Sequence, residues 1–306
     1  MKILVIFTGG TIGSRIKDGW ISTDSSTKYA LIESYKADTD ISFETEEPYF
    51  LLSENLSAKS INLLMDHLYT ALSKDFDGII VTHGTDTLHF SAAAAHLAFA
   101  SADKPIVFVS ANYPLENKAS NGDDNFEGAV EFIKSGVKSG VYISYKNPSG
   151  EHFIHSADKA LGFSENDDSI YSLNKKPFAV YKNKKVTVFG KPSLEVSVRT
   201  AFCEFPNILV ISTHPADSFA YSLENCNAVI LRPYHSGTLN TENSAFKAFL
   251  ERAKNIPVFL ANAPEGTTYE TTKEYEKLGI ISLPHSTFAH TYMKIWANIS
   301  ESKNLF

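Results

Sequence analysis

The sequence has only two cysteines among its 306 residues, Cys203 and Cys226. Two cysteines so far apart in the chain form neither a disulfide framework nor a zinc motif. The histidines do not supply a metal site either, because no H-E-x-x-H or similar ligand spacing occurs. We therefore expect a protein of a reducing compartment, the cytoplasm, with no metal ion.

An excess of basic residues is also lacking, because 28 Lys and Arg stand against 35 Asp and Glu, for a formal net charge of -7. This balance argues against nucleic acid or an anionic membrane as a partner. No run approaches the roughly 20 apolar residues that cross a bilayer. The apolar run at 3–7 is too short for a signal peptide and is better interpreted as a first strand.

Short apolar runs recur along the chain and alternate with amphipathic segments. The runs are typical of buried strands and occupy residues 3–7, 78–81, 105–110, 141–144, 207–212, 227–234, 256–261 and 279–283. Helical periodicity covers residues 57–74, 88–100 and 243–253. Continuous apolar strands that alternate with helices predict an α/β fold in which helices cover both faces of a largely parallel sheet.

The alternation of strands and helices lapses between residues 174 and 206, where lysines are frequent. We interpret this stretch as a crossing between two domains. The expected organisation is a larger N-terminal α/β domain at 1–180 with a parallel or mixed sheet, a connector at 181–205, and a smaller C-terminal α/β domain at 206–306.

Two of the predicted strands end in turns that combine glycine with threonine. The first strand leads into "TGGTIG" at 8–13, and the strand at 78–81 leads into "THGTDT" at 82–87. Glycine permits positive φ and close backbone approach, so Thr11 and Thr85 can each be presented at a sheet edge. Chemistry in open α/β sheets is usually placed at such strand ends. Together the two turns predict one pocket that holds two hydroxyls and a carboxylate.

A threonine hydroxyl needs an activating base before it attacks a carbonyl carbon. His83 and His89 are near in the sequence, but we expect a histidine in such a turn to point into packing. A lysine is the other option, provided that burial lowers its pKa from about 10.4. A nucleotide- or flavin-binding protein is the alternative interpretation, although the chain lacks both G-x-G-x-x-G and a Walker lysine.

The pair of motifs resembles the two signature motifs of the bacterial-type L-asparaginase family, in its cytoplasmic, type I-like branch. That family also includes glutaminase-asparaginases and a tRNA-amidotransferase subunit. Residues 256–283 resemble its C-terminal domain, so the resemblance covers essentially the whole chain. The resemblance implies an amidohydrolase that cleaves the C–N bond of a linear amide and needs no cofactor. It also implies a homodimer or a homotetramer.

The resemblance also implies a role for each residue that matches a motif. Thr11 takes the position of the nucleophile. Thr85 and Asp86 join a lysine in a second triad, and Lys159 in "IHSADK" is the best match for that lysine.

Substrate binding is implied for Ser53 and Glu54 in "LLSENLSA", together with Gly84. The carboxylate of Glu54 could accept a hydrogen bond from an α-ammonium group. Ser53 and Ser57 could each instead cap a helix at its N-terminus.

Trp20 stands in the loop after Thr11, where cytoplasmic relatives carry a tyrosine. Because an indole N–H donates but cannot relay a proton, either Tyr29 takes over that role or Trp20 serves only as a lid.

The expected reaction converts L-asparagine to L-aspartate and ammonia through a threonine acyl-enzyme. L-Glutamine is an alternative substrate, because one methylene changes binding by only about 1 to 3 kcal/mol. We do not expect the tRNA-amidotransferase subunit, which would need an additional N-terminal portion and tRNA contacts.

Overall fold

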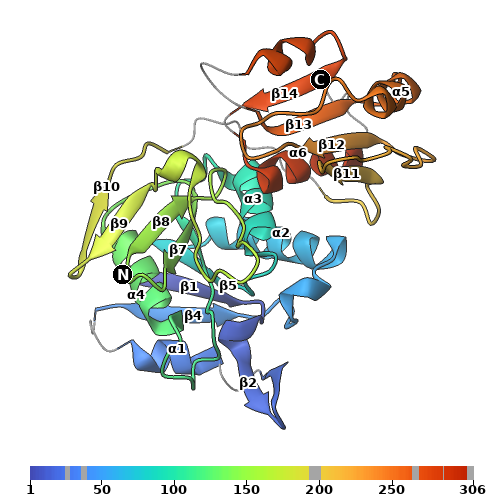
Figure 1. Ribbon diagram of the computed structural model, residues 1–306. Coiled ribbons are helices and arrows are strands. Elements are labelled where there is room, and N and C mark those ends of the chain that lie inside the picture. Colours follow the sequence, from blue (N-terminus) through green and yellow to red (C-terminus); the bar gives the residue numbers. More distant parts are fainter. Residues whose placement is uncertain (25–27, 36–39, 193–200, 264–268, 285, 302–306) are drawn as a thin grey trace. The chain divides into compact units, whose positions relative to one another are not determined.

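The computed structural model describes residues 1–24, 28–35, 40–192, 201–263, 269–284 and 286–301 (Figure 1). The chain forms two compact units, Met1–Arg199 and Thr200–Phe306. The larger unit contains a mixed sheet flanked by helices, and the smaller unit contains a separate parallel sheet. This confirms the predicted α/β class.

The main sheet of the larger unit has eight described strands in the order β10-β9-β8-β7-β6-β5-β1-β4. The strands from β4 to β7 run parallel, whereas β8, β9 and β10 pair antiparallel with their neighbours. Their bounds are β1 (Lys2–Phe7), β4 (Ser42–Glu46), β5 (Gly78–Thr82), β6 (Ile106–Val109), β7 (Val141–Lys146), β8 (His152–Ser156), β9 (Ala179–Lys182) and β10 (Lys185–Val188). Because β1, β5, β6 and β7 are parallel, the turns that follow them all lie at the carboxyl end of these strands.

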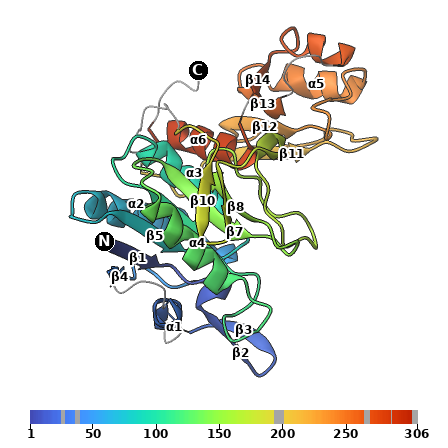
Figure 2. The ribbon, with the colours of Figure 1, turned by 90° about the vertical axis from the view of Figure 1, so that its left-hand side faces the viewer.

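Helices cover both faces of this sheet. They are α1 (Lys28–Ser34), α2 (Ala58–Leu72), α3 (Leu88–Phe99) and α4 (Gly122–Lys134). Figures 1 and 2 show α1 and α4 on one side of the sheet and α2 and α3 on the other. The side chains explain this layering, because strand residues such as Leu4 and Val5 are both buried although they point to opposite faces.

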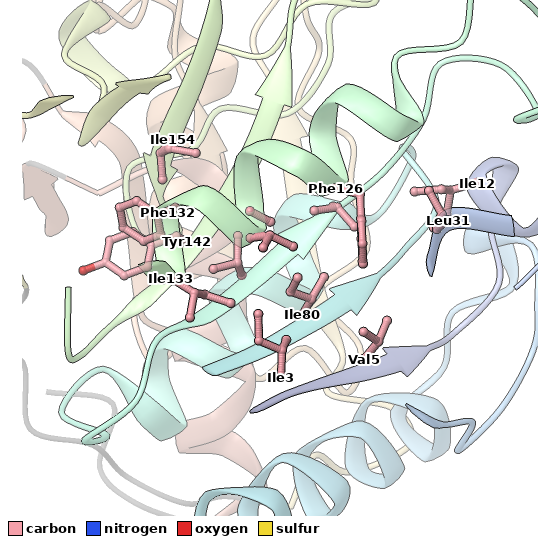
Figure 3. Packing of buried hydrophobic residues seen from close by; sticks show 14 of the residues in the cluster. Ile3, Val5, Ile12, Leu31, Ile80, Phe126, Phe132, Ile133, Tyr142 and Ile154 are labelled. Atoms are coloured by element: carbon pink, nitrogen blue, oxygen red, sulfur yellow. The ribbon is translucent and has the colours of Figure 1, made fainter. Parts of the chain in front are cut away.

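The packing between α4 and the sheet is rich in aromatic and branched side chains (Figure 3). Phe126 and Phe132 of α4 pack against Ile80 of β5 and Tyr142 of β7, and the rings of Phe132 and Tyr142 meet edge to face at 4.8 Å. Burying a large apolar side chain contributes about 1.5 to 3 kcal/mol. This core fixes the strands whose ends carry the threonine turns.

The smaller unit is a parallel sheet with a helix on each face. Its strands follow the order β11-β12-β13-β14, with bounds β11 (Ile208–Ser212), β12 (Ala228–Arg232), β13 (Val258–Ala263) and β14 (Ile280–Pro284). Phe246 and Phe249 of α5 (Ser244–Arg252) pack on one face, and Ile295 of α6 (Phe288–Ser300) packs on the other. A 3₁₀ helix, η5 (Glu270–Glu274), precedes β14.

The region between the two sheets differs from the expectation of a plain connector. Residues 181–188 belong to β9 and β10, which extend the main sheet as an antiparallel hairpin. Asn183 and Lys184 form its turn, both with positive φ, as two-residue hairpin turns require. Residues 193–200 of the expected connector lie outside the described residues.

No helix within the described part of the chain combines the length and the apolar character that spanning a bilayer requires.

Candidate functional site

The first threonine turn follows β1 at the carboxyl end of the parallel strands. Thr8 is buried, and its hydroxyl donates to the carbonyl of Thr82 at 2.6 Å, which ties the end of β1 to the end of β5. Gly9 and Gly10 have φ values of 98° and 75°, a region that favours glycine. They lead into a short 3₁₀ helix, η1 (Thr11–Gly13), whose first residue is half-buried.

The second threonine turn follows β5, and Phe7 and Thr82 are direct partners where β1 and β5 end. His83 is buried beneath this turn, with its Nδ1 2.9 Å from the carbonyl oxygen of Gly84. Burial lowers the pKa of His83 to about 4, and the hydrogen bond to Gly84 opposes this shift. The ring is therefore a neutral packing element, as we expected for a histidine within this turn. Asp86 is exposed and Thr85 half-buried.

The two turns are in backbone contact with each other. A Cβ atom added to Gly10 would lie 2.2 Å from the backbone nitrogen of Gly84. A Cβ atom added to Gly84 would lie 2.5 Å from both Cβ and Oγ of Ser53. Neither glycine can carry a side chain without displacing its neighbour. Thr11 and Thr85 directly follow these glycines, so the fold brings together the two turns and Ser53.

Ser53 begins a second 3₁₀ helix, η3 (Ser53–Asn55), and is only 4% exposed. Its hydroxyl donates to Oδ2 of Asp86 at 3.2 Å. Its carbonyl accepts a hydrogen bond of 2.9 Å from the hydroxyl of Thr87. Glu54 is the exposed neighbour of Ser53. Ser53 is thus held by the last two residues of the "TDT" triplet, Asp86 and Thr87.

Only one of the two candidate serines, Ser53 and Ser57, caps the helix α2 that follows them. Ser57 is the N-cap of α2, because its side chain accepts a hydrogen bond of 3.3 Å from the backbone nitrogen of Ser60. Ser53 lies outside that helix and contacts Asp86 instead.

Sequence reasoning missed two contributors to this arrangement. Leu51 accepts a hydrogen bond of 2.9 Å from the backbone nitrogen of Gly10 and forms an isolated parallel bridge with Gly9. Thr87 holds the carbonyl of Ser53. Thr87 could have been predicted, because it is the third threonine of "THGTDT". The contact of Leu51 could not, because Leu51 makes it through backbone atoms, which do not depend on the type of side chain.

Lys159 lies in a different environment. It follows β8, in which Ser156 is opposite Tyr142 near the start of β7. The chain therefore leaves β8 at the amino end of the parallel strands, whereas both threonine turns lie at the carboxyl end. Nζ of Lys159 lies 3.4 Å from Oδ2 of Asp158, and the lysine side chain is 38% exposed.

The segment after Lys159 returns along α3. Asp158 Oδ1 lies 3.8 Å from Nε2 of His96 in the last turn of α3. A Cβ atom on Gly162 would lie 2.6 Å from Nε2 of His89 in the first turn. Lys159 is thus carried on a segment that runs beside α3 toward the end where Thr85 and Asp86 lie, and its role as a base stays a prediction.

The hairpin after Thr11 consists of β2 (Ser14–Lys17) and β3 (Trp20–Thr23). Trp20 is 77% exposed at its tip, and Tyr29 in α1 is also exposed. The backbone nitrogen of Ile16 donates to Glu116 at 2.8 Å, which anchors the hairpin to the larger unit.

Among the described residues, no group of three or more His, Cys, Asp or Glu side chains is arranged to hold a metal ion. The polar groups that the two turns and Ser53 bring together are hydroxyls, backbone amides and the carboxylates of Glu54 and Asp86. This set suits acyl transfer by a hydroxyl nucleophile.

The sequence of this chain is similar to sequences of known proteins. The family model "Asparaginase, N-terminal" matches residues 2–194. A glutamyl-tRNA(Gln) amidotransferase subunit from Archaeoglobus fulgidus is 31% identical over 179 residues, which cover 57% of this chain and 42% of that relative. The chain thus spans less than half the length of this relative. An L-asparaginase from Thermococcus kodakarensis is 22% identical over 100% of this chain and 94% of its own length.

Solved structures show the same fold. The thermostable L-asparaginase from Thermococcus kodakarensis aligns over 100% of this chain and 94% of its own with a TM-score of 0.82 and 22% identity. A probable cytoplasmic L-asparaginase from Campylobacter jejuni aligns over 100% of this chain and 96% of its own, with a TM-score of 0.78 and 20% identity. With its two threonine turns joined through Gly10 and Gly84 and the family match over residues 2–194, the chain belongs to the asparaginase family.

Proposed function

We propose that this protein hydrolyses the side-chain amide of L-asparagine to give L-aspartate and ammonia. One observation carries the proposal: the backbones of Gly10 and Gly84 pack so closely that a Cβ on Gly10 would lie 2.2 Å from Gly84 N. The residues that follow them, Thr11 and Thr85, are therefore presented from adjoining turns. The family match and the L-asparaginases among its relatives support this choice of reaction.

Thr11 is the proposed nucleophile. Its Oγ attacks the amide carbon, the C–N bond breaks, and the amide nitrogen leaves as ammonia after it gains a proton. The hydroxyl proton of Thr11 passes to a base, for which we assign Thr85, Asp86 and Lys159 as one proton-transfer group. Water then attacks the acyl-enzyme ester, which releases L-aspartate and restores the Thr11 hydroxyl.

Ser53, Glu54 and Gly84 are the proposed substrate-binding residues. A free amino acid presents an ammonium group, for which the carboxylates of Glu54 and Asp86 are suitable acceptors. Ser53 already donates to Asp86 at 3.2 Å, so it holds that carboxylate in one orientation. The backbone N–H groups near Gly84 and Thr85 could stabilise the oxyanion, and one such donor typically contributes about 2.7 to 4 kcal/mol.

We also propose the partners, the compartment and the oligomeric state of the protein. The net charge of -7 fits a protein with a small anionic product and no polyanionic partner. We propose a cytoplasmic homodimer or homotetramer, because the sequence motifs resemble those of the cytoplasmic branch of the family. Light scattering of the purified protein would measure its oligomeric state.

Ammonia release tests the function directly. Purified protein is incubated separately with L-asparagine and L-glutamine, and ammonia is measured over time. We expect turnover of L-asparagine, with the ratio of the two kcat/KM values giving the specificity. Thermal stabilisation by AMP or FMN is measured in parallel. Stabilisation by a nucleotide or flavin without ammonia release from either amide would contradict the proposal and favour a binding protein.

A further inference from the structure

A short segment between β4 and α2, residues 51–53, lies against both threonine turns. At the first turn, the backbone nitrogen of Gly10 donates to the carbonyl of Leu51 at 2.9 Å. At the second turn, Ser53 occupies the space beside Gly84, because a Cβ atom on that glycine would lie 2.5 Å from the serine side chain. We call residues 51–53 the bridging segment, since they connect the two turns that carry the proposed reacting threonines.

Two hydrogen bonds from the second turn hold Ser53. Its hydroxyl donates to Oδ2 of Asp86 at 3.2 Å, and its carbonyl accepts a bond of 2.9 Å from Oγ1 of Thr87. These bonds fix the side chain and the backbone of Ser53 together. The same carbonyl also accepts a bond of 3.1 Å from the backbone nitrogen of Leu56, so it stays paired without Thr87. The bond from Thr87 therefore decides where Ser53 lies and is not needed to satisfy a buried acceptor.

Thr87 is the N-cap residue of α3, a position at which a threonine side chain usually accepts a hydrogen bond from the first turn of the helix. Within the described part of the chain, the side chain of Thr87 makes no such capping bond. The N-caps of α2 and α6, Ser57 and Thr287, both accept one. The hydroxyl of Thr87 is thus directed to Ser53 and not to its own helix. Its loss should leave the hydrogen bonds of α3 intact.

We propose that Thr87 is a positioning residue for the substrate: its hydroxyl holds Ser53, and through Ser53 the carboxylate of Asp86, where the ammonium group of the amino acid binds. This role rests on the proposed hydrolysis. The reacting threonines are placed by a different contact, the close packing of Gly10 against Gly84. Loss of the Thr87 hydroxyl should therefore weaken substrate binding and leave the chemical step nearly unchanged.

Steady-state ammonia release by the full chain, with L-aspartate as an inhibitor, separates binding from chemistry. Thr87→Val keeps the size of the side chain and removes its hydroxyl. We expect KM for L-asparagine and the inhibition constant of L-aspartate each to rise about tenfold, with kcat within about threefold of the wild type. Thr87→Ser keeps the hydroxyl and should match the wild type. The control Thr70→Val removes a threonine hydroxyl that donates to a backbone carbonyl of α2, also at 2.9 Å, and should change none of the three parameters.

Hydrogen exchange of the full chain tests the hold on Ser53 without any reaction. The backbone amides of Asn55 and Leu56 donate within η3, at 3.0 and 3.1 Å. Local opening of this short helix exposes both amides to exchange. Because the bond from Thr87 anchors the start of η3, both amides should exchange faster in Thr87→Val. They should exchange at the wild-type rate in Thr87→Ser and in Thr70→Val.

An unchanged KM in Thr87→Val, or a lower kcat at unchanged KM, would overturn the positioning role. If Thr87→Val does not fold, a raised KM in Thr87→Ser would overturn it, because the hydroxyl is still present. Unchanged amide exchange in Thr87→Val would overturn the hold on Ser53, whether or not the protein hydrolyses amides. A wild type that releases no ammonia would instead contradict the proposed function and with it the substrate role, while the exchange rates would still decide whether Thr87 holds Ser53.

Discussion

The hydroxyl of Ser53 donates a hydrogen bond of 3.2 Å to the carboxylate of Asp86, a residue 33 positions further along the chain. This bond orients Asp86 within the turn that also carries Thr85. We expect Ser53→Ala to lower kcat/KM for L-asparagine by about ten- to a hundredfold, because one hydrogen bond to a charged group contributes about 1.5 to 3 kcal/mol. Steady-state ammonia release measures the effect.

Ser57→Ala is the matched control for that change. Ser57 caps α2 through the backbone of Ser60 and does not contact Asp86 in the described structure. Its loss should cost about 1 kcal/mol of unfolding free energy and leave kcat/KM near the wild-type value. Equal losses of activity in both variants would show that Ser53 acts only through the stability of this region.

The contact between Gly10 and Gly84 predicts a steep penalty for a single methyl group. Gly10→Ala places a Cβ 2.2 Å from the backbone nitrogen of Gly84, so one of the two threonine turns must move. A displacement of about 1 Å in a catalytic group can cost a factor of 10². We therefore expect at least a hundredfold loss of ammonia release, together with a lower free energy of unfolding.

Gly136→Ala separates this clash from backbone strain. Gly136 has a φ of 83°, close to the 75° of Gly10, but a Cβ there would meet nothing within 4 Å. We expect a stability cost of about 1 to 2 kcal/mol from the left-handed conformation alone and unchanged activity. If Gly10→Ala behaved like Gly136→Ala, close packing of the two turns would not be needed for function.

Lys159 provides the most discriminating test of the proposed proton-transfer group. If it takes part, Lys159→Met should lower kcat by about 10² to 10⁴, the usual contribution of a general base. Lys138→Met, which removes another exposed lysine, should have no effect. Activity of Lys159→Met within twofold of the wild type would exclude Lys159 from the proton-transfer group.

Stability should fall as the pH drops below about 6.5. Burial lowers the pKa of His83 and His152 to about 4 and that of His155 to about 3. Between these values and 6.5, the unfolded chain binds protons that the folded chain does not, so acid favours unfolding. Each histidine should cost about 2 kcal/mol at pH 5 relative to pH 8.

Chemical denaturation at several pH values measures this slope. His155→Phe should reduce it by about one third, since one of three contributing groups is removed. Stability that stayed constant from pH 8 to pH 5 would contradict the neutral, buried state of these rings.

The strands that build both sheets could be predicted because their apolar residues are continuous. Each of the eight segments predicted as strands overlaps a strand of the structure, for example β5 in "GIIVT" and β12 in "AVILR". A strand that is buried on both faces needs no polar residue, so the sequence carries a strong signal. That signal weakens in β9 and β10, where many residues are exposed and lysines are tolerated.

The candidate site was predictable as a meeting of two turns but not in its detail. Glycine before each threonine indicated close backbone approach, and Gly10 and Gly84 do make it. The place of Lys159 could not be foreseen, because it depends on the antiparallel direction of β8, which no residue pattern in "HFIHS" fixes.

The central claim is that the hydroxyl of Thr11 becomes acylated. Mass spectrometry of protein that is quenched with acid during turnover of L-asparagine tests it most directly. We predict one added aspartyl group on the peptide that contains Thr11, and its loss in Thr11→Ala together with ammonia release. Ammonia release by Thr11→Ala at the wild-type rate, or an acyl group on a different residue, would contradict the account.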